Sequence, residues 1–123
     1  MQISQDSYSG QFIIQAYGDN KITINNTTYE LSLIIGANHL LVDSLPKTIS
    51  ELQNTHWQPL LELKPEVVLI GTGPKLQFIS PTLLQDFYQN HIGVEIMNNA
   101  AACRTLTVLL AENRKAFAAL FVK

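Results

Sequence analysis

Three short apolar runs in the second half of the chain alternate with two stretches of helical spacing. Each run is nearly continuous rather than alternating, which is typical of a strand covered on both faces. The order strand, helix, strand, helix, strand requires crossover helices, and such connections join parallel neighbours in a right-handed sense. The predicted elements are strands at 66–70, 94–97 and 116–122 and helices at 81–91 and 100–114.

The ends of these two helices carry local signals. Ser80 precedes Pro81, so a hydroxyl is available to cap the free amides and Pro takes the first helical position. Gly93 is placed to let the chain leave the first helix in a left-handed conformation. The second helix is apolar on all sides, so we expect the sheet to cover one side and another helix or a second subunit to cover the rest.

The first half of the chain is predicted to be a β-meander. Residues 27–35 (TTYELSLII) alternate polar and apolar side chains, which is the period of a sheet with one solvated face. Residues 1–10 are polar, and we expect them to be loosely held. The predicted strands are 11–17, 21–24, 27–35 and 39–42, with turns at 18–20 and 25–26.

The middle of the chain changes character. A helix is predicted from Ser50, as its N-cap, towards Leu61, with Pro59 as an interruption. Pro65 then marks the boundary with the first buried strand.

Composition and charge narrow the class of protein. The 123 residues are 46% apolar and 15% charged, which is the balance of one globular domain spanning 1–123. A net charge of −2 leaves no broad basic surface for nucleic acid, and no apolar run reaches the roughly 20 residues of a membrane helix. One cysteine and the lack of a secretory signal favour a soluble cytoplasmic protein.

Four segments of the second half resemble one family. They are Gly71-Thr72-Gly73, GVEIM at 93–97, AACRT at 101–105 and LLAENR at 109–114. In order and spacing they are similar to a family of small α/β domains of largely unknown function, which includes NADH dehydrogenase (complex I) assembly factor 3 of mitochondria. The resemblance implies a three-layer α/β fold around a mixed, mostly parallel central sheet in which one strand runs opposite to the others. It implies no established reaction.

The chain departs from the family pattern at three places. Asn99 replaces a usual Thr, Thr105-Leu106-Thr107 replaces Thr-Tyr-Asn, and Asn113 replaces a usual Gly. The change at Asn113 is mild, because Asn also tolerates a left-handed turn. The missing Tyr and Asn weaken the case for a shared polar site on the helix.

A candidate ligand site lies at the expected carboxyl ends of two neighbouring parallel strands. The loop Gly71-Thr72-Gly73 follows one strand and Asn98-Asn99 the next, at the edge where open α/β sheets bind ligands. Arg104 at a nearby helix start makes a small anion the expected ligand. The competing interpretation is a tight strand-end turn, because a lone Gly-x-Gly is a weak motif.

Cys103 has two interpretations. In the first turn of a helix, beside Arg104, its thiol would be activated. Alternatively, Cys103, Leu106 and Leu110 share one helix face, which makes the thiol an inert core residue.

The other reactive residue types form no recognisable motif. His39, His56 and His91 lie far apart, so neither a metal site nor a cofactor is expected. Glu95 interrupts an apolar strand, so it is either exposed at an edge or paired internally, with Arg104 or Arg114 as candidates.

Two functions therefore remain open. The first is a protein-binding or assembly-helper module with an unidentified protein partner and the possibility of homo-oligomers. The second is a small-molecule or anion site, possibly enzymatic, at Gly71, Thr72, Gly73, Asn98, Asn99, Cys103 and Arg104. The lack of a complete catalytic constellation favours the first.

Overall fold

The computed structural model describes residues 11–18 and 20–122, and its centre is a five-stranded sheet. The predictions for residues 1–10, and for residue 19 within the first turn, lie outside the described residues. The sheet order is β5-β4-β8-β6-β7. These strands are β4 (Leu33–Ile35), β5 (Leu40–Leu41), β6 (Val67–Gly71), β7 (Gly93–Met97) and β8 (Ala116–Leu120).

The directions of the strands confirm the mixed sheet. Strand β6 lies between β7 and β8 and is parallel to both. Strand β4 is antiparallel to β8 and to β5, so β4 alone runs opposite to the other four. Ala118 pairs with Leu69 on one side and with Ile35 on the other. The three apolar runs of the second half thus form the three parallel strands, and the last of them is central.

The meander forms a separate small sheet. Its antiparallel strands are β1 (Ile14–Gly18), β2 (Lys21–Ile24) and β3 (Thr27–Tyr29). The prediction of one strand over 27–35 is wrong, because β3 ends at Tyr29 and β4 begins in the other sheet at Leu33. Polar–apolar alternation persists across this break, so the pattern alone does not show that the chain changes sheets.

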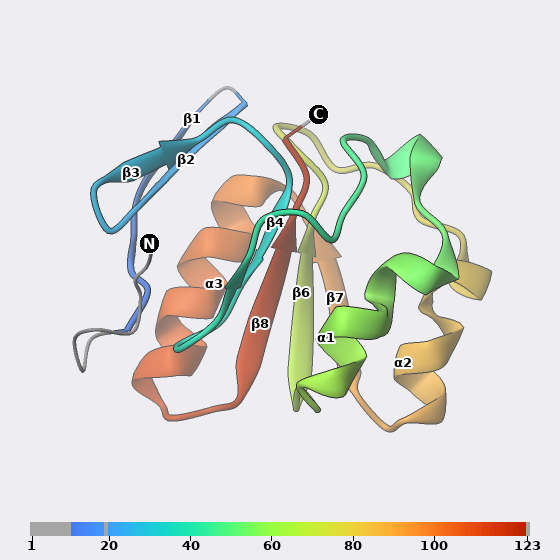
Figure 1. Ribbon diagram of the computed structural model, residues 1–123. Coiled ribbons are helices and arrows are strands. Elements are labelled where there is room, and N and C mark those ends of the chain that lie inside the picture. The colour runs from blue at the N-terminus through green and yellow to red at the C-terminus, as the bar shows by residue number, and fades with distance from the viewer. Residues whose placement is uncertain (1–10, 19, 123) are drawn as a thin grey trace.

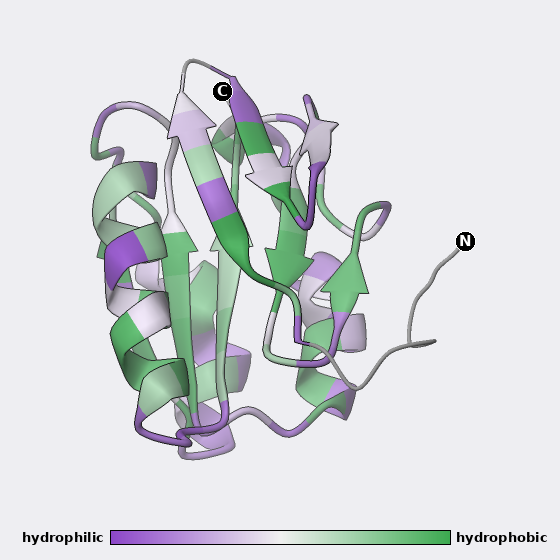
Figure 2. Ribbon diagram, turned by 90° about the vertical axis from the view of Figure 1, so that its left-hand side faces the viewer, coloured by the Kyte–Doolittle hydropathy of each residue, from purple (hydrophilic) through white to green (hydrophobic). Residues whose placement is uncertain are grey.

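Helices cover both faces of the central sheet, as Figure 1 shows. On one face lies α3 (Asn99–Ala111), and on the other lie α1 (Gln58–Glu62) and α2 (Gln85–Gln89) with short 3₁₀ turns. In Figure 2 the central strands are coloured as hydrophobic along most of their length, and polar colours gather in the turns. The architecture is therefore three-layered.

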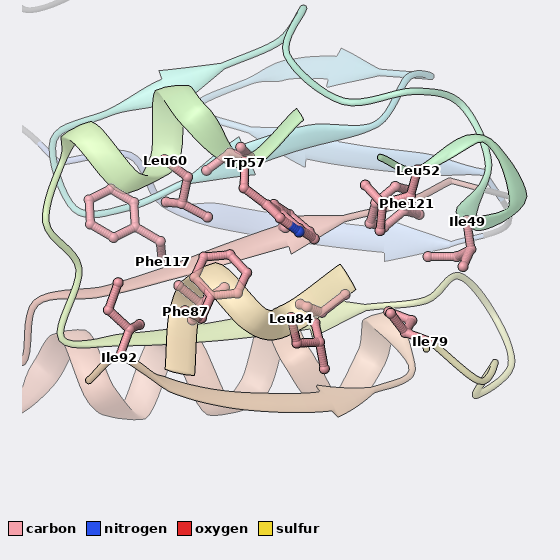
Figure 3. Close-up of a cluster of buried hydrophobic side chains, with 14 residues drawn as sticks. Ile49, Leu52, Trp57, Leu60, Ile79, Leu84, Phe87, Ile92, Phe117 and Phe121 are labelled. Atoms are coloured by element: carbon pink, nitrogen blue, oxygen red, sulfur yellow. The ribbon is translucent and has the colours of Figure 1, made fainter. Parts of the chain in front are cut away.

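The face beneath α1 and α2 is filled by large side chains (Figure 3). Trp57 is fully buried there, its ring N–H donates to the carbonyl of Leu83 at 2.7 Å, and its ring centroid lies 5.0 Å from that of Phe87. Ile70 and Phe121 belong to the same cluster. The sheet and both short helices thus share one core.

Helix α3 packs against the central sheet on one side and against the meander on another. The contact with the meander was not expected. Strand β1 packs against it, and Ile22 and Ile24 of β2 share its core cluster. The meander therefore takes the place expected of another helix, and cover by a second subunit stays a prediction.

Three predicted helix boundaries also differ. The helix predicted from Ser50 is two 3₁₀ turns, η2 (Ile49–Glu51) and η3 (Asn54–Trp57), followed by α1, and Ser50 is not its N-cap. Ser80 precedes the 3₁₀ turn η4 (Pro81–Leu84) without a side-chain capping bond. The left-handed residue after α2 is His91, with φ of 58°, rather than Gly93. Asn113 does adopt the left-handed conformation, at φ of 61°.

Candidate functional site

Thr72 stands at the carboxyl end of β6 and is completely buried. Its hydroxyl donates to the carbonyl of Lys75 at 2.8 Å and accepts the amide N–H of Gln77 at 2.9 Å. The Gln77 side-chain amide donates back to the Thr72 carbonyl at 2.7 Å. The Thr72 side chain therefore holds the following loop in one shape.

Asn99 joins the ends of three strands. Its side-chain oxygen accepts the N–H of Gly73 at 3.0 Å, and its side-chain nitrogen donates to the carbonyl of Phe121 at 2.8 Å. The Asn99 N–H donates to the Gly73 carbonyl at 2.8 Å. The side chain needs space, and Gly71 supplies it: a Cβ on Gly71 would collide with Asn99 Oδ1. The predicted strand-end residues are thus brought together in one corner.

Asn98 has a different task in the same corner. It is the N-cap of α3, and its side-chain oxygen accepts the N–H of Ala101 at 2.8 Å. This bond satisfies one of the free amides with which a helix begins. The Asn98 carboxamide oxygen is therefore already occupied, because it caps the first turn of α3.

Cys103 is buried on the sheet side of α3, with 2% of its surface exposed. Burial raises the pKa of the thiol to about 11, and the nearby charge of Arg104 offsets this only in part. At neutral pH the thiol is therefore protonated, and only the thiolate is a good nucleophile. This geometry favours the core interpretation.

Arg104 of α3 bonds to the meander. It is exposed, and its guanidinium donates to the Tyr17 hydroxyl of β1 at 3.4 Å. The seven predicted residues thus divide into a corner of five, a buried thiol and a cation at the meander. The donors and acceptors described above are used within the protein, and the anion site stays a prediction.

The structure settles the alternatives for Glu95 and gives its candidate partner Arg114 another acidic partner. Glu95 is exposed on β7, the outermost strand of the sheet, which is the edge position expected as one alternative. Arg114 forms an ion pair with Glu66, with Arg114 Nε 3.0 Å from Glu66 Oε2. Its hydrogen bond and charge lower the pKa of Glu66. This pair joins the start of β6 to the turn before β8.

A surface that sequence reasoning missed lies on the loop held by Thr72. Leu76 is 66% exposed and Phe78 is 82% exposed, although both are large and apolar. We name residues 74–78 the apical loop; it follows the carboxyl end of β6, at the top of Figure 1. The available indication in the sequence is a short segment with three apolar residues, Leu76, Phe78 and Ile79, between the turn signals Gly73-Pro74 and Ser80-Pro81.

A shallow apolar groove lies between the first described residues and α3. Its volume is about 260 Å³, and it is bounded by Phe12 and Ile14 on one side and Leu106 and Leu110 on the other. Thr107, on its rim, donates its hydroxyl to the carbonyl of Cys103 at 3.0 Å. The groove therefore offers apolar contact and little polar recognition.

The described residues include no candidate membrane-spanning helix and no candidate metal cluster. None of the helices within 11–18 and 20–122 has the length and apolar character that crossing a membrane requires. Within the same ranges, no three His, Cys, Asp or Glu side chains gather closely enough to hold a metal ion.

Solved structures share this fold. An NMR structure of a Xanthomonas campestris protein is 31% identical to this chain and superposes with a TM-score of 0.86. The match covers 99% of this chain and 92% of that one. The arrangement of the sheet and helices is therefore common to both proteins.

Curated relatives carry two kinds of name. The "13 kDa major membrane protein" of Francisella tularensis subsp. holarctica is 26% identical over 116 residues, which are 93% of this chain and 94% of that protein. The mouse NADH dehydrogenase [ubiquinone] 1 alpha subcomplex assembly factor 3 is 39% identical over 61 residues, or 50% of this chain. The match spans only 33% of the assembly factor.

The family itself is established by a match over residues 14–121, which include every described strand and helix. That family is described as "Protein of unknown function (DUF498/DUF598)". The resemblance noted in the sequence is thus confirmed, and this chain belongs to the DUF498/DUF598 family.

Proposed function

We propose that this protein is a protein-binding module that helps an assembly to form, and that the apical loop is the surface that docks its partner. The observation that carries the proposal is the exposure of Leu76 and Phe78 on a loop held in place. Exposed large apolar groups that lie together are typical of binding surfaces.

The fixed shape of the loop supports docking. The bonds between Thr72 and Gln77 span the loop, and Ile79 is buried in the core directly after Phe78. A loop that is already ordered loses little conformational entropy when a partner binds. Aromatic residues, Phe among them, are enriched at the cores of protein interfaces.

The relatives add support of a second kind. The mouse relative is named an assembly factor, and its matched segment is 39% identical to this chain. We carry the assembly role to this chain as a proposal, because the match spans a third of that protein.

We also infer one domain that acts in the cytoplasm. The meander shares a core cluster with the central sheet, since Ile22 and Ile24 pack with Leu120 and Val122. One buried cysteine supports a reducing compartment.

The test is quantitative affinity purification from the cells that produce the protein. The double variant Leu76→Ser/Phe78→Ser removes the apolar surface of the loop. Val108→Ser is the matched control, because Val108 is 56% exposed on α3. We expect a specific partner that the wild type and the control recover equally and that the double variant recovers at least about tenfold less.

The controls separate binding from folding. Because the substituted side chains are exposed, the circular dichroism spectrum and the urea midpoint should stay close to those of the wild type. Equal recovery by all three proteins, or recovery of no specific partner, contradicts the proposal. A partner that proves to be this chain itself would identify a homo-oligomer formed through the loop.

A further inference from the structure

The outermost strand of the central sheet, β7, is long and regular for an edge. It pairs over five residues with β6, from Gly93 opposite Val67 to Met97 opposite Gly71, without a break in register. The opposite edge of the same sheet is β5, which has two residues. Native proteins commonly shorten, bulge or cover their edges, and β7 is neither short nor bulged.

The direction of the backbone groups follows from the bonds to β6. The Gly93 N–H donates to the Glu66 carbonyl at 3.1 Å, and the Met97 carbonyl accepts the Thr72 N–H at 2.9 Å. Since backbone groups alternate along a strand, Gly93, Glu95 and Met97 face β6, whereas Val94 and Ile96 face outward. Two N–H and two carbonyl groups therefore point away from the sheet, and no described strand pairs with them.

Glu95 stands at the centre of this edge with its side chain exposed. If a second copy paired antiparallel across the full length of β7, Glu95 would lie opposite its own copy. Two like charges directly opposite one another are destabilising. The same carboxylate favours a strand that places Lys or Arg at that position.

The apical loop lies at one end of this edge. Its base is tied to the carboxyl end of β7 by the bond from Thr72 to Met97 and by that from Asn99 to Gly73. Ile79, which directly follows the loop, and Ile96 of β7 pack in one cluster. An extended segment along β7 therefore reaches the base of the apical loop at the carboxyl end of the strand.

From these observations we infer that β7 accepts an extended segment of the protein partner as a sixth strand of the sheet. A basic residue of the segment faces Glu95, and an apolar residue contacts the apical loop. The inference rests on the proposed function and names the chemistry of the partner. Antiparallel pairing is slightly more stable than parallel pairing. In a segment that pairs antiparallel to β7, the apolar residue lies N-terminal to the basic residue.

A peptide probe tests the edge without the natural partner. The probe is an acetylated, amidated peptide of alternating Val and Thr, with Leu at its N-terminus and Lys at its centre. Its control has Glu at the centre. In the free protein, the amide hydrogens of Val94 and Ile96 should exchange with solvent much faster than those of Glu95 and Met97, which donate to β6. The Lys peptide should slow exchange at Val94 and Ile96 specifically.

Charge reversal provides the matched variant. With the wild type we expect the Lys peptide to bind about two- to fivefold more tightly than the Glu peptide. Glu95→Lys should invert this preference, and Glu95→Gln should abolish it. Because Glu95 is exposed, both variants should fold as the wild type does.

The outcomes are distinct from those of the loop experiment. Protection of Val94 and Ile96 that follows the charge at position 95 supports the inference. Protection elsewhere, no protection at millimolar peptide, or a preference that Glu95→Lys leaves unchanged overturns it. If Leu76→Ser/Phe78→Ser loses the partner while Glu95→Lys retains it, the proposed function stands and the strand addition fails.

Discussion

Asn99 and Gly73 are joined by two hydrogen bonds that run in opposite directions. The Gly73 N–H donates to the Asn99 side-chain oxygen at 3.0 Å, and the Asn99 N–H donates to the Gly73 carbonyl at 2.8 Å. The remaining Asn99 amide group holds the carbonyl of Phe121. One side chain therefore closes the carboxyl ends of β6 and β8 against the start of α3.

Removal of this side chain should destabilise the fold. Asn99→Ala leaves the Gly73 N–H and the Phe121 carbonyl without their partner, and we expect the free energy of unfolding to fall by about 2 to 3 kcal/mol. Urea denaturation followed by circular dichroism measures it. Asn90→Ala, which removes one exposed bond to the Asp86 carbonyl, should cost less than about 1 kcal/mol. Equal losses in the two variants would contradict the role given to Asn99.

Gly71 should tolerate no side chain. A Cβ at this position would meet Asn99 Oδ1 and would lie 2.7 Å from Leu120 Cδ2, so Gly71→Ala forces the corner apart. We expect a loss of about 1 to 3 kcal/mol, the usual range for overpacking. Gly18→Ala is the control, because a Cβ there meets nothing within 4 Å and the change should stay within about 0.5 kcal/mol. A Gly71→Ala protein as stable as the control would show that the corner relaxes freely.

Cys103 should be unreactive in the folded protein. Its thiol is buried and its pKa is raised to about 11, so the thiolate fraction is negligible at pH 7 to 8. An aromatic disulfide reagent should label the native protein at least about 100-fold more slowly than the protein in urea. Native labelling as fast as that of the unfolded chain would revive the hypothesis of an activated thiol.

The same thiol gives a dependence of stability on pH. The unfolded chain loses the thiol proton near its ordinary pKa of about 8.5, before the folded chain does. The contribution is therefore fully present below about pH 8.5 and is lost as the pH rises towards 11. Relative to Cys103→Ala, the wild-type free energy of unfolding should fall by about 1 kcal/mol per pH unit in that window. Parallel pH profiles of the two proteins would contradict the raised pKa.

Trp57 should anchor the face beneath α1 and α2. Trp57→Phe removes the ring N–H that donates to the Leu83 carbonyl at 2.7 Å and leaves unfilled space beside Phe87. We expect a loss of about 2 to 3 kcal/mol in urea denaturation followed by circular dichroism. Tyr88→Phe changes an aromatic side chain that is 53% exposed and should be nearly neutral. A Trp57→Phe protein with the free energy of unfolding of the wild type would contradict this role of Trp57.

The candidate site shows which features of a site the local sequence pattern can predict. The position after a strand singles out Asn98 and Asn99, and the Asn99 side chain does lie against Gly71 and Gly73. The Asn98 bond to Ala101 is local, but the partners of Asn99 are not predictable, because the carbonyl of Phe121 and the N–H of Gly73 are distant from it in the sequence. Leu76 and Phe78 show the reverse case, since an apolar residue in a short loop is as compatible with burial as with exposure.

The sequence by itself determined the three parallel strands and the long helix, because a continuous apolar run or a helical stripe is a local property. Burial was predicted correctly for β6 and β8, whereas β7 is an edge strand with no fully buried residue. It also indicated the edge or paired position of Glu95. The tertiary structure decided which surfaces meet: the break between β3 and β4, the covering of α3 by the meander and the space that Gly71 leaves for Asn99. These depend on contacts between residues far apart in the chain, and hydrophobic attraction is not directional, so a pattern of apolar positions shows that a face is buried without showing what buries it.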